Sequence, residues 1–199
     1  DVASITFHNY AAGYKTTDYP YLRNALNNST KLKITSSRYS RLDVSNNQLE
    51  SLDISQSPNI QELYCTYNNL TALDVTRHRQ LAKLDCEVNR LTELNLETNS
   101  LLRYLKCNYN QLTALKTTNN PGLRTLEIKS NPIDLLDVSN NQEINILRCQ
   151  ECPNLREVWF QNQTQHALIP TCVLDLDITK PCYKENDGTY VLMNYYNED

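Results

Sequence analysis

Glycine is scarce in this chain of 199 residues, which contains three, whereas glycine makes up about 7% of an average protein. Phenylalanine, with two copies, and tryptophan and methionine, with one each, are also rare. Long apolar runs are missing, because even residues 167–170 and 191–193 fall far below the roughly 20 residues that cross a bilayer. The sequence therefore predicts no transmembrane segment and a chain that must turn without glycine.

Positive charge is not in excess, because 19 Lys and Arg face 23 Asp and Glu, for a net charge of -4. Nucleic-acid binding needs clustered basic residues to neutralise phosphates, so nucleic acid is not an expected partner. The three histidines, at positions 8, 78 and 166, have no metal-ligand spacing, and no nucleophile has a catalytic motif around it. We expect no enzyme, no cofactor and no metal, and we expect His78, between two arginines, in a solvated loop.

The chain is rich instead in tyrosine, with 13 copies, and in asparagine, and it contains an internal repeat. Leucine recurs at a constant spacing of about 21 residues, within the range of leucine-rich repeats. The residues of this column are Leu42, Leu63, Leu84, Leu105, Leu126 and Leu147. The register holds for five turns and then slips by one, so that Leu155, Val158 and Phe160 come one residue late. This slip predicts the end of the regular array.

Each turn of the repeat contains two alternating segments. Leu63-Tyr64-Cys65-Thr66 places Leu and Cys on one face, as in a short strand, and stacked copies predict a parallel sheet. A second alternation, at residues 73–76 and its equivalents, predicts a second extended arm, with no helix of useful length between the arms. The asparagine five residues after the leucine, such as Asn68, can bond backbone groups that the bend leaves inside the fold.

The unit at residues 84–96, Leu-Asp-Cys-Glu-Val-Asn-Arg-Leu-Thr-Glu-Leu-Asn-Leu, resembles LxxLxCxxNxLTxLDVS, the repeat of bacterial secreted and cell-surface leucine-rich-repeat proteins of internalin-like architecture. The resemblance covers roughly residues 32–160. It implies a right-handed, β-rich superhelix with few helices, and a role in adhesion and in protein or glycan binding. The N-terminal residues lack an initiator Met and a leader-like start, which also suits a secreted or cell-surface protein.

A solenoid exposes its core at both ends and needs caps. We predict an N-terminal cap at residues 1–31, the repeats at 32–160 and a C-terminal cap at 161–199. Residues 18–26 favour a short helix, and Leu32 and Ile34 resemble the second arm of a partial repeat. Alternation at residues 171–178 and at 189–193, with a turn signal between them, favours a β-hairpin at the other end.

Seven cysteines invite a count of disulfides. Cys65, Cys86 and Cys107 occupy a column that Val and Ile also fill, which favours buried core thiols. Cys149 and Cys152 form a CxxC pair, which alone is weak evidence for metal or redox chemistry. Both residues also occupy columns of the repeat, which favours a structural role. Cys172 and Cys182 lie outside the array and are the candidates for a disulfide.

The outward residues of the second arm include Asp53 and Asp74 on neighbouring turns. A calcium site is one interpretation of this contact between like charges. The other is solvated carboxylates, relieved by Asn95 and Lys116 farther along the column.

The first strand is expected to line the concave face, where its outward residues form a surface of alternating charge with tyrosine. The predicted binding residues are Glu62, Tyr64, Lys83, Asp85, Tyr104, Lys106, Glu127 and Arg148. Tyr67 and Tyr109, at the strand exits, add exposed aromatic rings of the kind enriched at interfaces. The alternating charges could equally compensate one another and only keep the face soluble.

Six turns at about 4.8 Å give this face a footprint of roughly 500 Å², which is below the about 800 Å² per partner of a standard interface. The sequence thus favours a non-catalytic module that binds a protein or glycan through the concave face. The alternative is a structural or spacer domain of a surface protein with no ligand of its own.

Overall fold

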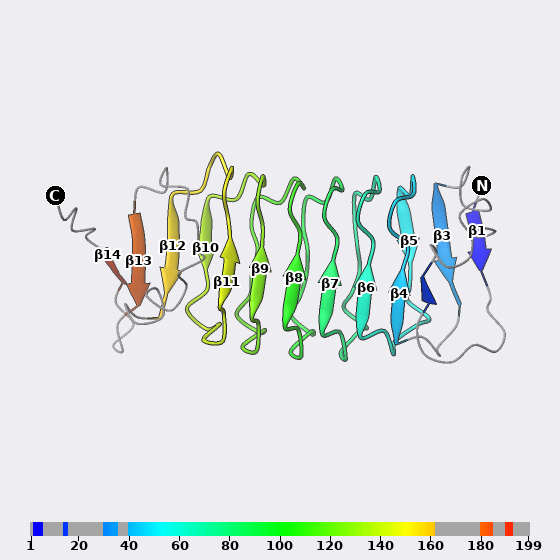
Figure 1. The fold of residues 1–199 in the computed structure, drawn as a ribbon, viewed down its shortest axis with the longest axis horizontal. Helices are drawn as coiled ribbons and strands as arrows, with labels where there is room; N and C mark the ends of the chain where they lie inside the picture. The colour runs from blue at the N-terminus through cyan, green and yellow to red at the C-terminus, as the bar shows by residue number, and fades with distance from the viewer. Residues whose placement is uncertain are drawn as a thin grey trace.

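The protein is a parallel-strand solenoid of about six turns, as the repeat predicted (Figure 1). The computed structural model describes residues 2–5, 14–15, 30–35, 40–161, 180–184 and 190–192. None of these described residues is helical. The helix expected at residues 18–26 lies outside them.

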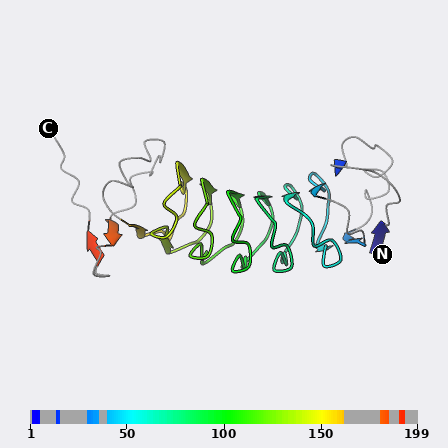
Figure 2. The same cartoon turned by 90° about the horizontal axis from the view of Figure 1, so that it is seen from below.

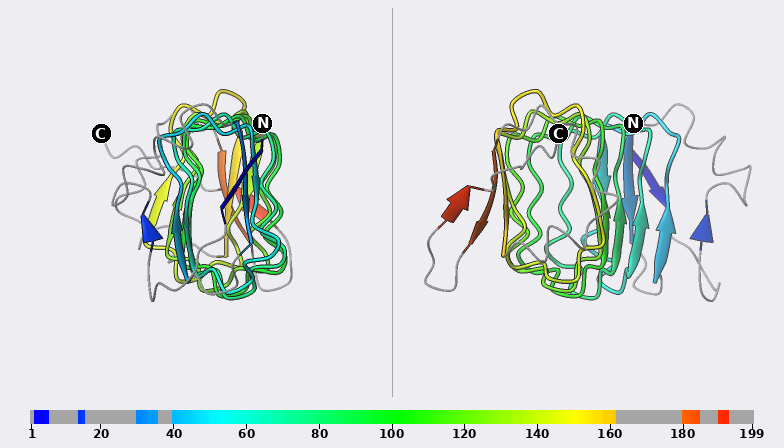
Figure 3. Two further views of the ribbon diagram at one scale, coloured as in Figure 1. Left: turned by 90° about the vertical axis from the view of Figure 1, so that its right-hand side faces the viewer. Right: turned by 60° about the vertical axis from the view of Figure 1, so that its left-hand side comes forward.

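One side of the solenoid is a seven-stranded parallel sheet with the order β11-β9-β8-β7-β6-β4-β2. Six of its strands are the first arms of successive turns, and the leucines of the repeat pair directly with one another across the sheet. Viewed along the array, the turns superpose as a flattened loop with an arm on each side (Figure 3). The strands are β2 (Tyr14–Lys15), β4 (Arg41–Asp43), β6 (Glu62–Tyr64), β7 (Lys83–Asp85), β8 (Tyr104–Lys106), β9 (Thr125–Glu127) and β11 (Ile146–Arg148).

The opposite side forms strands only near the two ends of the array. One sheet has the order β1-β3-β5, with β1 (Val2–Ile5), β3 (Lys31–Ile34) and β5 (Ser51–Asp53), and a second contains β10 (Leu135–Asp137) and β12 (Glu157–Phe160). The expected second arm is present on every turn, but residues 72–75, 93–96 and 114–117 make no strand pairing. Figure 2 shows the reason, because the array curves with the seven-stranded sheet on its inner side. The arms on the outer side are therefore spread apart.

The ends of the array follow the predicted register in part. β3 pairs with β5 in parallel, so Leu32 does belong to the second arm of a partial repeat. Val158 pairs with Leu136, which confirms the slip of one residue. β13 (Lys180–Lys184) pairs in parallel with β12 and antiparallel with β14 (Tyr190–Leu192). The hairpin therefore uses β13 as its first strand, and the expected strand at residues 171–178 lies outside the described residues.

The core between the two arms is built from the leucine and cysteine columns. Leu63, Leu84 and Leu105 are fully buried, and so are the thiols Cys65, Cys86 and Cys107, which form no disulfide. Desolvation raises the pKa of each of these three thiols. The prediction of core thiols is thus confirmed for this column.

The remaining cysteines lie toward the C-terminal end. Cys149 is buried in the same column as Cys107, and Cys152 takes the place of the repeat asparagine and donates its Sγ hydrogen to the Ile128 carbonyl at 3.3 Å. Both positions serve the packing of the array. Cys172 lies outside the described residues and only the backbone of Cys182 is described, so their disulfide stays a prediction.

The predicted asparagine column forms a polar ladder inside the bend. Asn68 accepts a bond from the Leu49 N–H at 3.0 Å and donates to three carbonyls, of Val44, Cys65 and Thr66, at 3.0, 3.1 and 3.2 Å. The same pattern repeats at Asn89, Asn110 and Asn131. Each amide therefore joins its own turn to the preceding one and satisfies backbone groups that no strand can reach.

A second polar ladder runs along the far bend, and the expectation for His78 was wrong. Its members recur every 21 residues and are all fully buried: Ser57, His78, Asn99, Asn120 and Asn141. His78 Nε2 lies 3.2 Å from the Ile54 carbonyl, and Asn99 donates to the carbonyls of Val75 and His78 at 3.0 and 2.8 Å. Desolvation lowers the pKa of His78, so its neutral ring fills an asparagine position. The arginines at 77 and 79 flank the ladder and are exposed.

The bend that follows the first arm turns without glycine through a backbone conformation that the sequence did not predict. The residue just before each ladder position adopts the left-handed conformation, with φ between 52° and 59°, at Asn46, Tyr67, Val88, Tyr109, Ser130 and Glu151. Asparagine tolerates this conformation, whereas a β-branched residue such as Val88 is strained in it. The fold thus repeats the left-handed conformation on every turn, and five of the six residues that adopt it are not asparagine.

Candidate functional site

The candidate site is the outer surface of the seven-stranded sheet, on the inner side of the curve (Figure 2). Within each strand the central leucine points into the core, so the two flanking side chains point outward. These flanking positions contain all eight residues predicted from the sequence. The parallel register aligns them in rows across β6, β7, β8, β9 and β11.

Glu62 organises the N-terminal part of this surface. Its carboxylate accepts the Tyr64 hydroxyl at 3.0 Å and pairs with Lys83 Nζ at 3.9 Å. Arg41 also reaches Glu62, at 3.6 Å, and its guanidinium lies 5.0 Å from the centre of the Tyr64 ring. Burial, assisted by the bond to Glu62, raises the pKa of Tyr64 to about 12. The ring of Tyr64 is therefore held in place by a cation and a carboxylate.

Glu127 organises the C-terminal part. It pairs with Lys106 Nζ at 3.4 Å and with Arg148 at 3.3 Å, and it accepts a bond from Asn108 at 3.2 Å. The side chain of Glu127 is only 8% exposed, so its charge lies beneath those of its partners. Lys106 Nζ also lies 5.5 Å from the centre of the Tyr104 ring. A partner would meet Lys106, Arg148 and Tyr104 before it met Glu127.

Asp85 lies between these two clusters and has no ion pair within 4 Å with any residue that the structure describes. Its Oδ1 is buried without a hydrogen-bond partner. Desolvation, followed by the charge of Glu87, raises the pKa of Asp85 to about 6. This carboxylate is the one predicted site residue whose buried oxygen the protein leaves unsatisfied.

The structure thus brings the predicted residues together as a surface of fixed side chains. The expected compensation between neighbouring turns is present at Glu62 with Lys83 and at Glu127 with Lys106 and Arg148. Cations cover one face of Tyr64 and one of Tyr104, which leaves less aromatic surface for stacking. The sequence could not predict these two contacts, because more than one Lys or Arg lies on the strand of each tyrosine or on the strands beside it.

The most exposed aromatic rings among the described residues lie at the edge of the sheet. Tyr67 is 58% exposed and Tyr109 is 46% exposed, and both occupy the left-handed position at the strand exit. Lys129 Nζ lies 5.6 Å from the centre of the Tyr109 ring and pairs with Glu151 at 2.8 Å.

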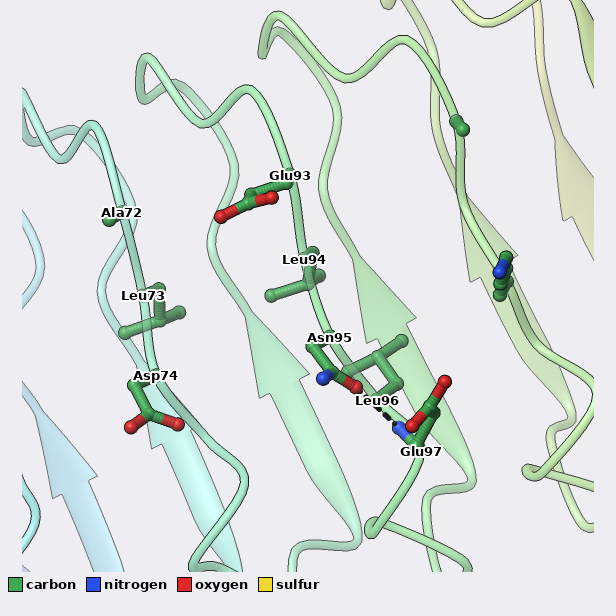
Figure 4. A pocket seen from close by; sticks show the side chains of 10 residues that line it. Ala72, Leu73, Asp74, Glu93, Leu94, Asn95, Leu96 and Glu97 are labelled. Carbon is green, nitrogen blue, oxygen red and sulfur yellow. Dashed lines mark hydrogen bonds between the residues drawn. The ribbon is translucent and has the colours of Figure 1, made fainter.

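The opposite side of the solenoid carries a shallow groove of about 450 Å³ between the unpaired second arms (Figure 4). Leu73 and Leu94 line it together with the polar residues Asp74, Asn95 and Lys116. Asp74 accepts bonds from the backbone and hydroxyl of Thr76, as Asp53 does from Ser55. These bonds lower the pKa of Asp74, and they lower that of Asp53 to about 2.

The second-arm carboxylates therefore close local turns. Asp53 also pairs with Lys33 at 3.1 Å, so it faces a cation on the neighbouring turn. The described residues contain no group of three or more His, Cys, Asp or Glu side chains arranged around a common metal position. The turn-closing bonds of Asp53 and Asp74 and the pairing of Asp53 with Lys33 favour the interpretation as solvated carboxylates over a calcium site.

The fold is that of a leucine-rich-repeat solenoid. No protein-family model matches the chain, and no curated protein matches it in sequence. Three solved bacterial structures are similar in fold. They are the functional domain of InlJ from Listeria monocytogenes, which includes a cysteine ladder, the internalin InlF from the same species, and the leucine-rich-repeat protein LIC12759 from Leptospira interrogans.

The InlJ domain is 21% identical with a TM-score of 0.52, over 73% of this chain and 37% of the other. The corresponding values are 18%, 0.51, 92% and 56% for LIC12759, and 17%, 0.47, 78% and 69% for InlF. The chain thus spans little more than a third of the InlJ domain. In the part of the chain that the structure describes, no helix is long and apolar enough to cross a membrane.

Proposed function

We propose that this chain is a non-catalytic recognition module that binds a protein or glycan through the concave face of its leucine-rich-repeat solenoid. The observation that supports this most directly is the fixed arrangement of Tyr64 and Tyr104 on a continuous sheet, each held by a cation. Side chains that are already ordered lose little conformational entropy when a partner binds. The similar fold of bacterial internalins supports a secreted or surface-attached protein.

Asp85 indicates which chemical group of a partner this surface would bind. Asp85 Oδ1 is buried and has no hydrogen-bond partner, so a partner's donor would satisfy it once the side chain turns this oxygen toward the surface. Such a donor could be an amide, an ammonium group or a sugar hydroxyl. We therefore place the centre of the binding surface between the clusters of Glu62 and Glu127.

One observation favours the alternative, a spacer domain with no ligand. Glu127 pairs with both Lys106 and Arg148 within the protein, so part of the predicted surface already has partners of its own. A spacer predicts a face that is indifferent to substitution, whereas a recognition module predicts loss of binding.

The test is a screen of the intact chain on a glycan array and on an array of purified extracellular proteins. The double variant Tyr64→Ala and Tyr104→Ala should lose the saturable hits, because it removes the aromatic anchors without leaving a buried charge unpaired. Thr92→Ala with Ala114→Ser, both exposed on the opposite side, is the control and should keep them. Hits that persist unchanged in the tyrosine variant would remove the site, and a chain with no saturable hit would favour the spacer.

A further inference from the structure

Three positions on consecutive turns form a row along one edge of the inner sheet, with two exposed tyrosines and a half-buried valine between them. This exit row consists of Tyr67, Val88 and Tyr109, which follow β6, β7 and β8 in the chain. The backbone N–H groups of these residues donate to the carbonyls of Glu87, Asn108 and Lys129 on the next turn, at 3.0, 2.9 and 2.8 Å. These bonds fix the three residues in a stack with the spacing of the turns.

The stability of the solenoid does not account for the side chains of the exit row. All three residues have left-handed backbone, with φ of 52°, 52° and 54°, a conformation that asparagine or glycine adopts at least cost. Asn46 occupies the equivalent position on an earlier turn, so the fold accepts the cheaper residue. Tyr67 and Tyr109 are also about half exposed and gain little from burial. Contact with another molecule would account for them.

We propose that the exit row binds a proline-rich segment of a partner protein in the polyproline II conformation. Tyr67 and Tyr109 are two turns apart, which corresponds to about 9.6 Å at the spacing of parallel strands. A polyproline II helix repeats every three residues, or about 9.3 Å, so prolines three residues apart can meet the two rings in the same way. Aromatic side chains are the usual recognition surface for this conformation.

Other partners fit this spacing less well. An extended strand repeats its side chains at about 6.6 Å, or about 13.2 Å over two repeats. Two turns of a helix rise about 10.8 Å, which is farther from the spacing of the rings than the polyproline II repeat. A glycan could stack on two rings at this distance, but Val88 between them offers no hydrogen bond to sugar hydroxyls. Lys129 occupies one side of the Tyr109 ring, so a proline would meet the other side of that ring.

Charge indicates which proline-rich segment would bind. Arg90 follows Val88 by two residues, is exposed, and forms no ion pair with any described residue. Because Arg90 is two residues from the middle of the exit row, we expect an acidic residue between the two prolines to pair with it. We therefore expect preference for proline-rich sequences that contain Asp or Glu over those that contain Lys.

This inference does not rest on the proposed concave-face function, because the exit row lies outside the eight residues of that surface. The probe is a synthetic peptide of about twelve residues with proline at every third position and one Asp between two of these prolines. Isothermal titration calorimetry should detect binding with a Kd below about 1 mM. A peptide of the same composition in scrambled order should bind at least about tenfold more weakly.

The variant Tyr67→Asn with Tyr109→Asn removes both rings and supplies residues that the left-handed conformation accepts, so it should fold. Its affinity for the peptide should fall by about tenfold or more, whereas Leu101→Asn, at a position 55% exposed elsewhere, should bind as wild type. Arg90→Glu should reverse the preference between Asp and Lys peptides. Tyr64→Ala with Tyr104→Ala should leave the affinity unchanged, which separates this site from the concave face. Absence of peptide binding, binding that survives the loss of both rings, or binding of a glycan in place of the peptide would overturn the proposal.

Discussion

Replacing Asn68 with leucine tests the physical basis of the repeat. The substitution adds apolar volume at a buried position, so a simple hydrophobic argument predicts a more stable protein. The structure predicts the reverse, because the side chain makes four bonds to backbone groups. The Cys65 carbonyl keeps a second donor, Asn89, and the Val44 carbonyl keeps Asn47. The buried Leu49 N–H keeps none.

One orphaned buried donor costs about 1–3 kcal/mol, and each lost hydrogen bond to a group that keeps another partner costs about 0.5–1 kcal/mol. Burial of the new leucine side chain offsets part of this loss of stability only if the side chain fits the site. If it does not fit, overpacking costs about a further 1–3 kcal/mol. We therefore expect Asn68→Leu to lower the free energy of unfolding by about 3 kcal/mol.

The matched control is Asn47→Leu, in the same column at the start of the array. Asn47 is half-buried, and its two bonds both go to carbonyls of its own turn, those of Val44 and Ser45. Its loss should cost about 1 kcal/mol. Urea denaturation followed by circular dichroism measures both variants. A free energy for Asn68→Leu within about 0.5 kcal/mol of the control, a difference typical of a neutral surface change, would refute the role given to the ladder.

Three further predictions concern the core and the second ladder. Asn99 Oδ1 is buried without a partner, whereas Asn141 Oδ1 accepts the Thr117 hydroxyl at 2.6 Å. Val75 holds the same position relative to Asn99, so Val75→Thr should supply the missing donor and leave the melting temperature unchanged or higher. The control Val44→Thr should lower the melting temperature. His78 has a pKa below 6.5 in the folded protein, so the unfolded chain binds the proton more readily and stability falls as the pH drops below about 6.5. His78→Asn should remove this contribution, so that the unfolding free energy of the variant falls less, relative to wild type, as the pH drops from 7 to 5. An unchanged slope would contradict the assignment. Cys86 should react with a thiol reagent only at the rate of unfolding, because it is fully buried with a raised pKa; rapid labelling of the native protein would show that the column is open.

The sequence predicted the parts of this fold that depend on a column of similar residues. Leu63 and its equivalents set the register of the sheet. Asn68 and its equivalents predicted side-chain hydrogen bonds to the backbone inside the bend, and the structure confirms these bonds. His78 was missed because it differs from the other members of its column. The signal was present, since Ser57, His78 and Asn99 are spaced by 21 residues, but two flanking arginines gave it the appearance of a loop.

Other features depend on the curvature of the whole array and on packing between turns, which the sequence of one repeat does not reveal. The second arms at residues 72–75 and 93–96 have the alternation of strands, and the curvature of the whole array decides that they do not pair. The same holds for the candidate site. Alternating charge predicted that Glu127 would be compensated, but only the packing of Lys106 and Arg148 over it shows that it is buried.

The measurement that tests the proposed function most directly is nuclear magnetic resonance mapping of the strongest hit from the glycan and protein arrays. On titration, our account predicts the largest shifts in the backbone and side chains of β6, β7 and β8, centred on Asp85, with Tyr64 and Tyr104 included. Shifts confined to the groove around Asp74 and Lys116, on the opposite side of the solenoid, would contradict recognition through the concave face.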